Sequence, residues 1–150
     1  MSVTRKQIIA EALTWLDTPW RHQAMIKGTE GGVDCAMFLV GVAKNLGMLD
    51  EDTINSIPNY PKDWHFHNTE SMMIPIIESL GAEKIYMSQS RPGDILLFKV
   101  GRCESHMGIK LAEDMFIHAY TSASTKKVLV MRMDDAWKKR LTHAYKFPGV

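Results

Sequence analysis

The chain has 150 residues, which is long enough for one domain with a hydrophobic core of its own. Apolar residues make up 45% of it and charged residues 23%, a balance that is typical of globular proteins. The formal net charge is +1, and because no basic stripe accompanies it this charge argues neither for nor against nucleic acid. We expect no nucleic-acid partner. No apolar run approaches the roughly 18 residues of a membrane-spanning helix, so we expect no membrane insertion.

The N-terminal sequence MSVTRKQIIAEALTWL has the pattern of an amphipathic helix over residues 4–16. It contains neither a long apolar segment nor a small-residue cleavage site, so it does not look like a signal peptide. The two cysteines cannot form a disulfide framework, and lone thiols are typical of a reducing compartment. We therefore expect the protein to be made in the cytoplasm without a signal peptide.

A loop and a second helix follow the first helix. Pro19 ends the first helix, because proline disfavours a helical conformation at the residue before it. Three glycines at positions 28, 31 and 32 indicate a flexible loop. Asp34 is a good N-cap, and it is followed by a mostly apolar helix over residues 35–46 that Gly47 ends.

The middle of the chain is polar and then helical. Residues 50–68 are polar and contain Pro58 and Pro61, which predicts a long surface excursion. Residues 69–80 predict a further helix, in which Pro75 is expected to cause a kink or a shorter helix.

The second half of the chain has the pattern of an antiparallel sheet. Short segments rich in β-branched and aromatic residues alternate with turn signals, which is typical of strands: DILLFKV, SHMGIKL, MFIHAY, KVLVMRM and THAYKF. Helices followed by a run of strands predict an α+β fold. We expect residues 1–150 to form a single domain.

Cys35 is the first candidate for chemistry, because it stands at the predicted start of a helix. The unpaired backbone N–H groups and the helix dipole at that position favour a thiolate, lower the thiol pKa and can stabilise an oxyanion. A buried, unreactive cysteine is the alternative reading of this position.

His106 and His118 are the candidate partners of the thiol. Each lies within a predicted strand, and the link between the two strands, AED or close to it, has an odd length. Residues of equal parity then face the same side of the sheet, so the two imidazoles are expected to lie beside each other. One would serve as the base, and the other would orient it.

Several strings in this order resemble the NlpC/P60 family of cell-wall cysteine peptidases over nearly the whole chain. They are DTPWRHQ, GGVDCAMFLVGVAKNLGM, RPGDILLF, SHMGIKL, FIHAY and a C-terminal tryptophan and arginine followed by AYKFPG. The resemblance is strongest to short members that phages and gene-transfer particles carry. It implies a papain-like fold, in which the helix that bears the cysteine packs on the sheet that bears the histidines.

The resemblance also implies roles and a substrate. Cys35 matches the nucleophile, His106 the base and His118 the residue that orients the base. The substrate is expected to be the peptide stem of peptidoglycan, cleaved between D-glutamate and a diamino acid. The predicted substrate-binding residues are Trp20, His22, Asp34 and Met37.

The sequence departs from the family pattern near the nucleophile. Ala36 and Met37 replace the usual Ser and Gly, and Trp20 replaces a Tyr whose hydroxyl lies near the sulfur. An indole N–H can donate a hydrogen bond but cannot accept one. These changes put the substrate and the rate in question more than the triad.

Other cysteine and histidine residues have weaker functional interpretations. Cys103 is expected to be an incidental loop thiol. His65 with His67, or Cys35 with both strand histidines, could hold a metal, but we expect no metal and no cofactor.

The function expected from the sequence is therefore a thiol hydrolase that acts at the cell wall, carried there by a phage tail and in contact with phage tail proteins. A related thiol amidase or acyltransferase is one alternative. A catalytically idle tail assembly or binding protein is the other.

Overall fold

The computed structural model describes residues 2–62 and 64–150, apart from the side chains of Phe66 and His67. Six helices and eight strands make up this part of the chain. The helices are α1 (Arg5–Leu13), α2 (Cys35–Asn45), α3 (Glu51–Asn55), α4 (Trp64–His67), α5 (Met73–Ser79) and α6 (Asp135–Arg140), with one 3₁₀ turn at η1 (Met87–Gln89).

The strands form two antiparallel sheets. The small sheet pairs β1 (Met25–Ile26) with β2 (Gly32–Val33). The large sheet has six strands in the order β3-β8-β4-β5-β6-β7. Its strands are β3 (Glu83–Ile85), β4 (Ile95–Val100), β5 (Cys103–Ala112), β6 (Met115–Thr121), β7 (Lys126–Arg132) and β8 (Leu141–Lys146). The predicted α+β class is confirmed.

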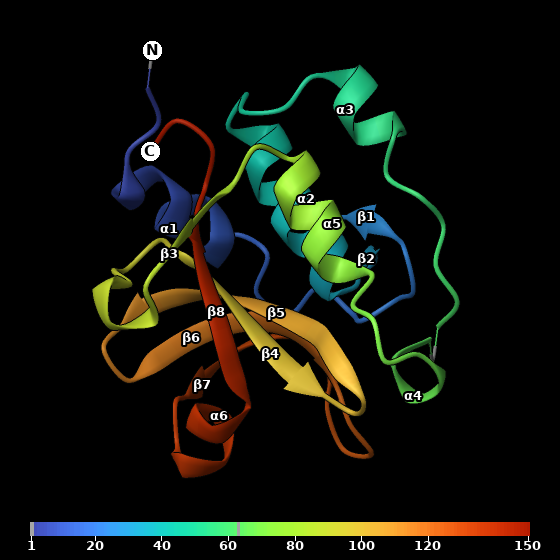
Figure 1. Ribbon diagram of the computed structural model, residues 1–150. Coiled ribbons are helices and arrows are strands. Elements are labelled where there is room, and N and C mark those ends of the chain that lie inside the picture. The colour runs from blue at the N-terminus through green and yellow to red at the C-terminus, as the bar shows by residue number, and fades with distance from the viewer. Residues whose placement is uncertain (1, 63) are drawn as a thin grey trace.

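Helices cover both faces of the large sheet, as Figure 1 shows. Helices α1, α2 and α5 lie on one side, and the short α6 lies on the other. A large apolar cluster fills the space between the sheet and α1, α2 and α5, and a smaller one around Trp137 lies beneath α6. The strands therefore carry apolar residues on both faces.

The N-terminal helices begin where side chains satisfy the free backbone N–H groups. Thr4 and Gln7 form a capping box at the start of α1. The contact between α1 and α2 needs Gly41, because a Cβ there would lie 2.6 Å from the Trp15 ring. That contact fixes the direction of α2, and with it the position of Cys35 at its first turn.

Two sequence predictions need correction, whereas the shorter helix expected around Pro75 is confirmed. Residues 50–68 are not only a surface excursion, because Tyr60 and Trp64 are buried in the main core. Strand β3 and helix α6 were not predicted. Pro75 is the third residue of α5, where its missing N–H removes no hydrogen bond of the helix.

Candidate active site

Cys35 is the first residue of α2, and Asp34 caps the helix. The Asp34 Oδ1 accepts a 2.9 Å hydrogen bond from the Met37 backbone N–H. Cys35 itself is half-buried. The cap holds the start of the helix in place, so the thiol has a fixed position relative to the sheet.

The Cys35 sulfur contacts the backbone of β5 at Ser105 and Met107, the residues on either side of His106. The thiol donates to the Ser105 carbonyl oxygen at 3.6 Å, and the Met107 N–H points toward the sulfur. Burial, and then the Asp34 carboxylate, raise the pKa of the Cys35 thiol to about 12. The backbone N–H groups of Met107, Ala36 and Cys35 act in the opposite direction but are outweighed.

The helix start therefore lowers the thiol pKa as predicted, but burial and Asp34 outweigh it, and the expected net lowering of the pKa is wrong for this site. The helix start is present, but so is a buried carboxylate one residue before the thiol. Cys35 rests as a neutral thiol at neutral pH.

His106 and His118 share a hydrogen bond, as the strand pattern predicted. The His106 Nε2 lies 2.6 Å from the His118 Nδ1, and the two ring planes are inclined by 71°. His106 is half-buried, whereas His118 has no exposed surface. This bond leaves the Nδ1 of His106 as the nitrogen that can take a proton from another group.

The register of β5 and β6 brings the two imidazoles together. Ile109 pairs with Ile117, and the chain turns through Glu113 and Asp114 with a register shift between Lys110 and Ala112. The turn is thus shorter than predicted, and the shift restores the equal parity. Gly108 leaves room for this arrangement, because a Cβ there would lie 3.2 Å from the His118 Cβ.

Both imidazoles are neutral at neutral pH. Burial, and then the Arg140 guanidinium, lower the pKa of His106 to about 3. Burial, and then His106, lower the pKa of His118 to about 2. A neutral imidazole is the form that accepts a proton, so His106 is in the state that a general base requires.

Cys35 and His106 line the same cavity, which has a volume of about 310 Å³. Its walls are formed by the loop before α2 and the first residue of that helix, the segment around α4, the first residue of α5, and parts of β4, β5 and β6. Its lining residues are Trp20, His22, Asp34, Cys35, Tyr60, Lys62, Trp64, His65, Met73, Val100, Ser105, His106, Ala119, Tyr120 and Thr121.

Three of the four predicted substrate-binding residues therefore lie at the cavity. Trp20 is half-buried there, and Lys62 stands 5.6 Å from its ring centroid. His22 is exposed at the rim. Met37 lies elsewhere, because its side chain is buried in the main core.

The sequence reasoning missed two residues that organise the site. The Tyr60 hydroxyl donates to the Asp34 Oδ2 at 2.6 Å, and the Gln23 backbone N–H donates to the same oxygen at 2.7 Å. Gln23 adopts a left-handed backbone (φ 53°), and its side-chain oxygen accepts from the Tyr60 N–H at 3.2 Å. The string YPKDW, which resembles a segment of the short phage-borne members, was the available signal, but it gave Tyr60 no role at the site.

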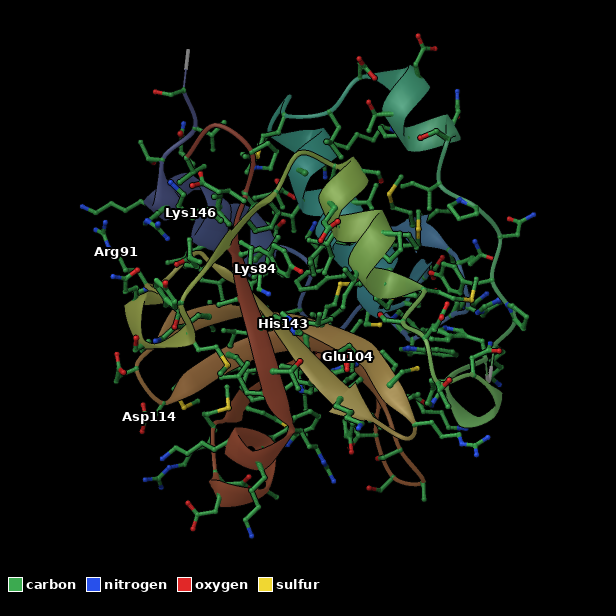
Figure 2. All side chains as sticks on the ribbon, in the orientation of Figure 1. Lys84, Arg91, Glu104, Asp114, His143 and Lys146 are labelled. Atoms are coloured by element: carbon green, nitrogen blue, oxygen red, sulfur yellow. The ribbon has the colours of Figure 1, made fainter. Side chains whose placement is uncertain are left out.

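The remaining thiol and histidine lie away from this chemistry. Cys103 is not a loop residue but the buried first residue of β5. His143 lies on β8, where its Nδ1 is 2.9 Å from the Thr142 hydroxyl (Figure 2).

The structure gathers no three His, Cys, Asp or Glu side chains into a possible metal site within residues 2–62 and 64–150. The side chain of His67, one half of the predicted metal pair with His65, lies outside the described residues. No helix in this part of the chain is long and apolar enough to cross a membrane.

The sequence matches one protein family and a set of curated proteins. The model of the NlpC/P60 family matches residues 17–146. The "Murein DD-endopeptidase MepS/Murein LD-carboxypeptidase" of Escherichia coli strain K12 is 35% identical over 63 residues, which are 41% of this chain and 32% of that protein. The chain therefore matches only about a third of the length of this relative.

Solved structures of the same family share the fold. The NlpC/p60 domain of the peptidoglycan hydrolase SagA has a TM-score of 0.61 and 22% identity, covering 96% of this chain and 99% of that one. The peptidoglycan hydrolase RipB of Mycobacterium tuberculosis has a TM-score of 0.60 and 16% identity, covering 97% and 65%. At these identities the likeness establishes the fold, and the predicted papain-like architecture is confirmed.

Proposed function

This chain belongs to the NlpC/P60 family, and we propose that it is a cysteine peptidase that hydrolyses peptide bonds in the stem peptides of peptidoglycan. The observation that carries the proposal is the arrangement of Cys35 and His106. Both line one cavity, and His106 is hydrogen-bonded on its far nitrogen to His118. A nucleophile, a base and a residue that orients the base are the parts that thiol catalysis needs. The peptidase domain would comprise residues 1–150.

The first step is attack by the sulfur on the peptide carbonyl. The Cys35 proton passes to the Nδ1 of His106 while a bond forms between the sulfur and the carbonyl carbon. The carbonyl π electrons move to the oxygen, and the free N–H groups at the start of α2 stabilise that oxyanion. Because the thiol and the imidazole are both neutral at rest, the proton moves during the attack rather than before it.

The second step releases the amine and then the acid. The oxyanion re-forms the carbonyl, the carbon–nitrogen bond breaks, and the proton on His106 goes to the leaving amine. A water molecule then gives a proton to His106 and attacks the thioester, which returns the Cys35 thiol and releases a carboxylate. His118 accepts from the His106 Nε2–H throughout, which keeps the base nitrogen facing the thiol.

The scissile bond that we propose is the one between D-glutamate and the diamino acid of the stem. The support is the resemblance of the ordered sequence strings to the family. The MepS relative is named for a different pair of activities, a DD-endopeptidase and an LD-carboxypeptidase. The fragments released from the wall distinguish these bonds.

We also propose that a phage or prophage tail carries the protein to the wall, where it contacts tail proteins. The string DTPWRHQ and the segment around Tyr60 support this, because they resemble short phage-borne members. Proteomics of particles induced from a strain that carries this gene tests it. Peptides of the chain should co-purify with intact tails, and their consistent absence would contradict the proposal.

Digestion of purified sacculi tests the activity. The protein should release fragments cut between D-glutamate and the diamino acid, as identified by mass spectrometry, and Cys35→Ala should release none. Cleavage that separates the whole stem from the glycan would indicate an amidase, and transfer to an added amine an acyltransferase. Binding without any release, by protein that is shown to be folded, would indicate an idle binding protein.

A further inference from the structure

His118 has a nitrogen that its surroundings do not satisfy with a hydrogen bond. In the described part of the chain, its Nε2 is buried and has no hydrogen-bond partner, while its Nδ1 is bonded to His106. A neutral imidazole carries one N–H and one lone pair. The unbonded position therefore holds either a buried N–H or a buried lone pair, and which one it holds matters for the base.

Only one of these two states lets His106 act as a base. If the His118 proton is on Nε2, its Nδ1 accepts from the His106 Nε2–H, and the Nδ1 of His106 is free to take the thiol proton. If the His118 proton is on Nδ1, it donates to the His106 Nε2 instead. The single proton of neutral His106 is then on Nδ1, where the base needs a lone pair.

The indole of Trp137 lies next to the imidazole ring of His118. Helix α6 places it 5.2 Å from the His118 ring centroid, with the two planes at 90°. Three neighbouring rings on the same sheet face lie at 5.1 to 5.6 Å from the indole and are also steeply inclined to it: Phe98 at 77°, Phe116 at 63° and Tyr120 at 73°.

These angles indicate that the face of the indole rests on the edges of the sheet rings. Among these four sheet rings the inclinations between neighbours are smaller, at 21° for His118 and Tyr120, 41° for Phe98 and Phe116 and 49° for Phe116 and His118. His106 differs from them, because its ring is inclined by 43° to the indole and by 71° to His118. One indole edge cannot point into several adjacent faces at once, whereas one indole face can cover several edges. Nε2 is at the tip of the imidazole, away from the backbone. The Arg140 guanidinium lies 4.9 Å from the indole ring and helps to hold it in place.

We propose that Trp137 is a positioning residue that receives the His118 Nε2–H on its π face and so holds the histidine pair in the tautomer that catalysis requires. The face of an aromatic ring is negative, so it attracts an N–H and repels a lone pair. Among the described residues, no hydrogen-bond acceptor competes with the indole face for this N–H. The consequence for turnover rests on the proposed peptidase function, but the tautomer itself does not.

The test reads the tautomer directly. Protein labelled with ¹⁵N at histidine gives long-range proton–nitrogen spectra that identify the protonated nitrogen of each ring. Wild-type His118 should be protonated on Nε2, with its N–H signal displaced by the ring current of the indole. Protonation on Nδ1 in the wild type would overturn the proposal, and this arm needs no variant to fold.

Two variants at position 137 distinguish the effect of an aromatic face from the effect of side-chain volume. Trp137→Phe keeps an aromatic face and should keep the tautomer, whereas Trp137→Leu should show a mixed tautomer. For Trp137→Leu, kcat should fall by about tenfold or more, with KM changed by less than about twofold. Trp15→Leu makes the same change in another buried indole, near α1 and α2, and should leave the His118 tautomer as it was.

An unchanged His118 tautomer in folded Trp137→Leu would overturn the proposal. The correct wild-type tautomer in a protein that releases nothing from sacculi would instead support the positioning role and contradict the peptidase function alone.

Discussion

The Tyr60 hydroxyl donates a 2.6 Å hydrogen bond to the Asp34 carboxylate, one residue before Cys35. A phenol therefore lies near Cys35 even though Trp20 stands where the family's Tyr is expected. Burial, and then Asp34, raise the pKa of the Tyr60 hydroxyl, so it stays protonated and acts as a donor. The negative charge of Asp34 opposes ionisation of the Cys35 thiol, and the hydrogen bond from Tyr60, in a separate segment of the chain, partly offsets that effect.

Removal of the Tyr60 hydroxyl should destabilise the protein and further suppress the thiolate. Tyr60→Phe removes a donor from a buried carboxylate, which should cost about 1.5–3 kcal/mol of unfolding free energy. It should also slow alkylation of Cys35 by iodoacetamide at a given pH, because the Asp34 charge is less well compensated. The exposed Tyr86 provides the control, as Tyr86→Phe should change neither quantity. Equal behaviour of the two variants would contradict this role of Tyr60.

Removal of the Asp34 charge should lower the pKa of Cys35. Asp34→Asn keeps a side-chain oxygen for the helix cap but removes the negative charge next to the thiol. Each unit by which the pKa falls raises the thiolate fraction near neutral pH about tenfold, which should speed alkylation even though the thiolate becomes somewhat less nucleophilic. Asp50→Asn is the matched control, because Asp50 caps α3 in the same way, accepting from Thr53 at 2.7 Å. A slower or unchanged rate in folded Asp34→Asn would contradict the assignment.

The two cysteines should differ in their alkylation. Cys35 is half-buried at a cavity, whereas Cys103 is almost fully buried, so Cys35 should react faster in the folded protein. Its rate should rise continuously from about pH 6 to pH 9, because a thiol with a raised pKa forms more thiolate at every step. A rate that levels off below neutral pH would instead indicate a preformed thiolate, and faster labelling of Cys103 would reverse the assignment.

Acid should weaken the fold through the histidine pair. The pKa of His118 is lowered to about 2 and that of His106 to about 3, from an ordinary 6.5. Below pH 6.5 the unfolded chain takes up protons that the folded chain does not, so the unfolding free energy is highest above that pH and decreases as pH falls. The buried His118 should account for up to about 1.4 kcal/mol per pH unit.

Urea unfolding between about pH 7 and pH 5 measures this slope. His118→Gln should reduce it, whereas His22→Gln, at an exposed loop residue, should not. An identical slope in His118→Gln and the wild type would contradict a buried neutral His118.

Most of the large sheet and the helices α1, α2 and α5 that cover one face were predictable from the sequence, but the edge strand β3 and helix α6 were not. Strands β4 to β8 are short segments rich in β-branched and aromatic residues between turn signals, and all five were found within a few residues. Strand β3 consists of Glu83, Lys84 and Ile85, which is too short and polar to show a period. Helix α6 is a single short segment whose cap, Asp134, has little periodic sequence behind it.

The candidate site was predictable where it depends on local pattern. Strand parity predicted His106 beside His118, although the shorter turn and the register shift that compensates for it were not foreseen. The cap at Asp34 placed Cys35 at a helix start. The predicted direction of the shift in the Cys35 pKa was wrong, because the shift depends mainly on burial, which no local pattern in the sequence reports. Tyr60 was missed because its partner, Asp34, is 26 residues away in the sequence, and only the folded chain brings the two together.

The roles within the triad are the central claim, and one series of variants measures them most directly. The quantity is kcat for hydrolysis of a tripeptide or tetrapeptide stem by folded variants. Cys35→Ala should abolish turnover, and His106→Ala should nearly do so, since a general base contributes about a hundred- to ten-thousandfold. His118→Ala should lose less, and His118→Gln or His118→Asn less still, because an amide oxygen can accept from the His106 Nε2–H. An inactive His118→Ala beside an active His106→Ala would reverse the two roles, and full activity in Cys35→Ala would contradict thiol catalysis altogether.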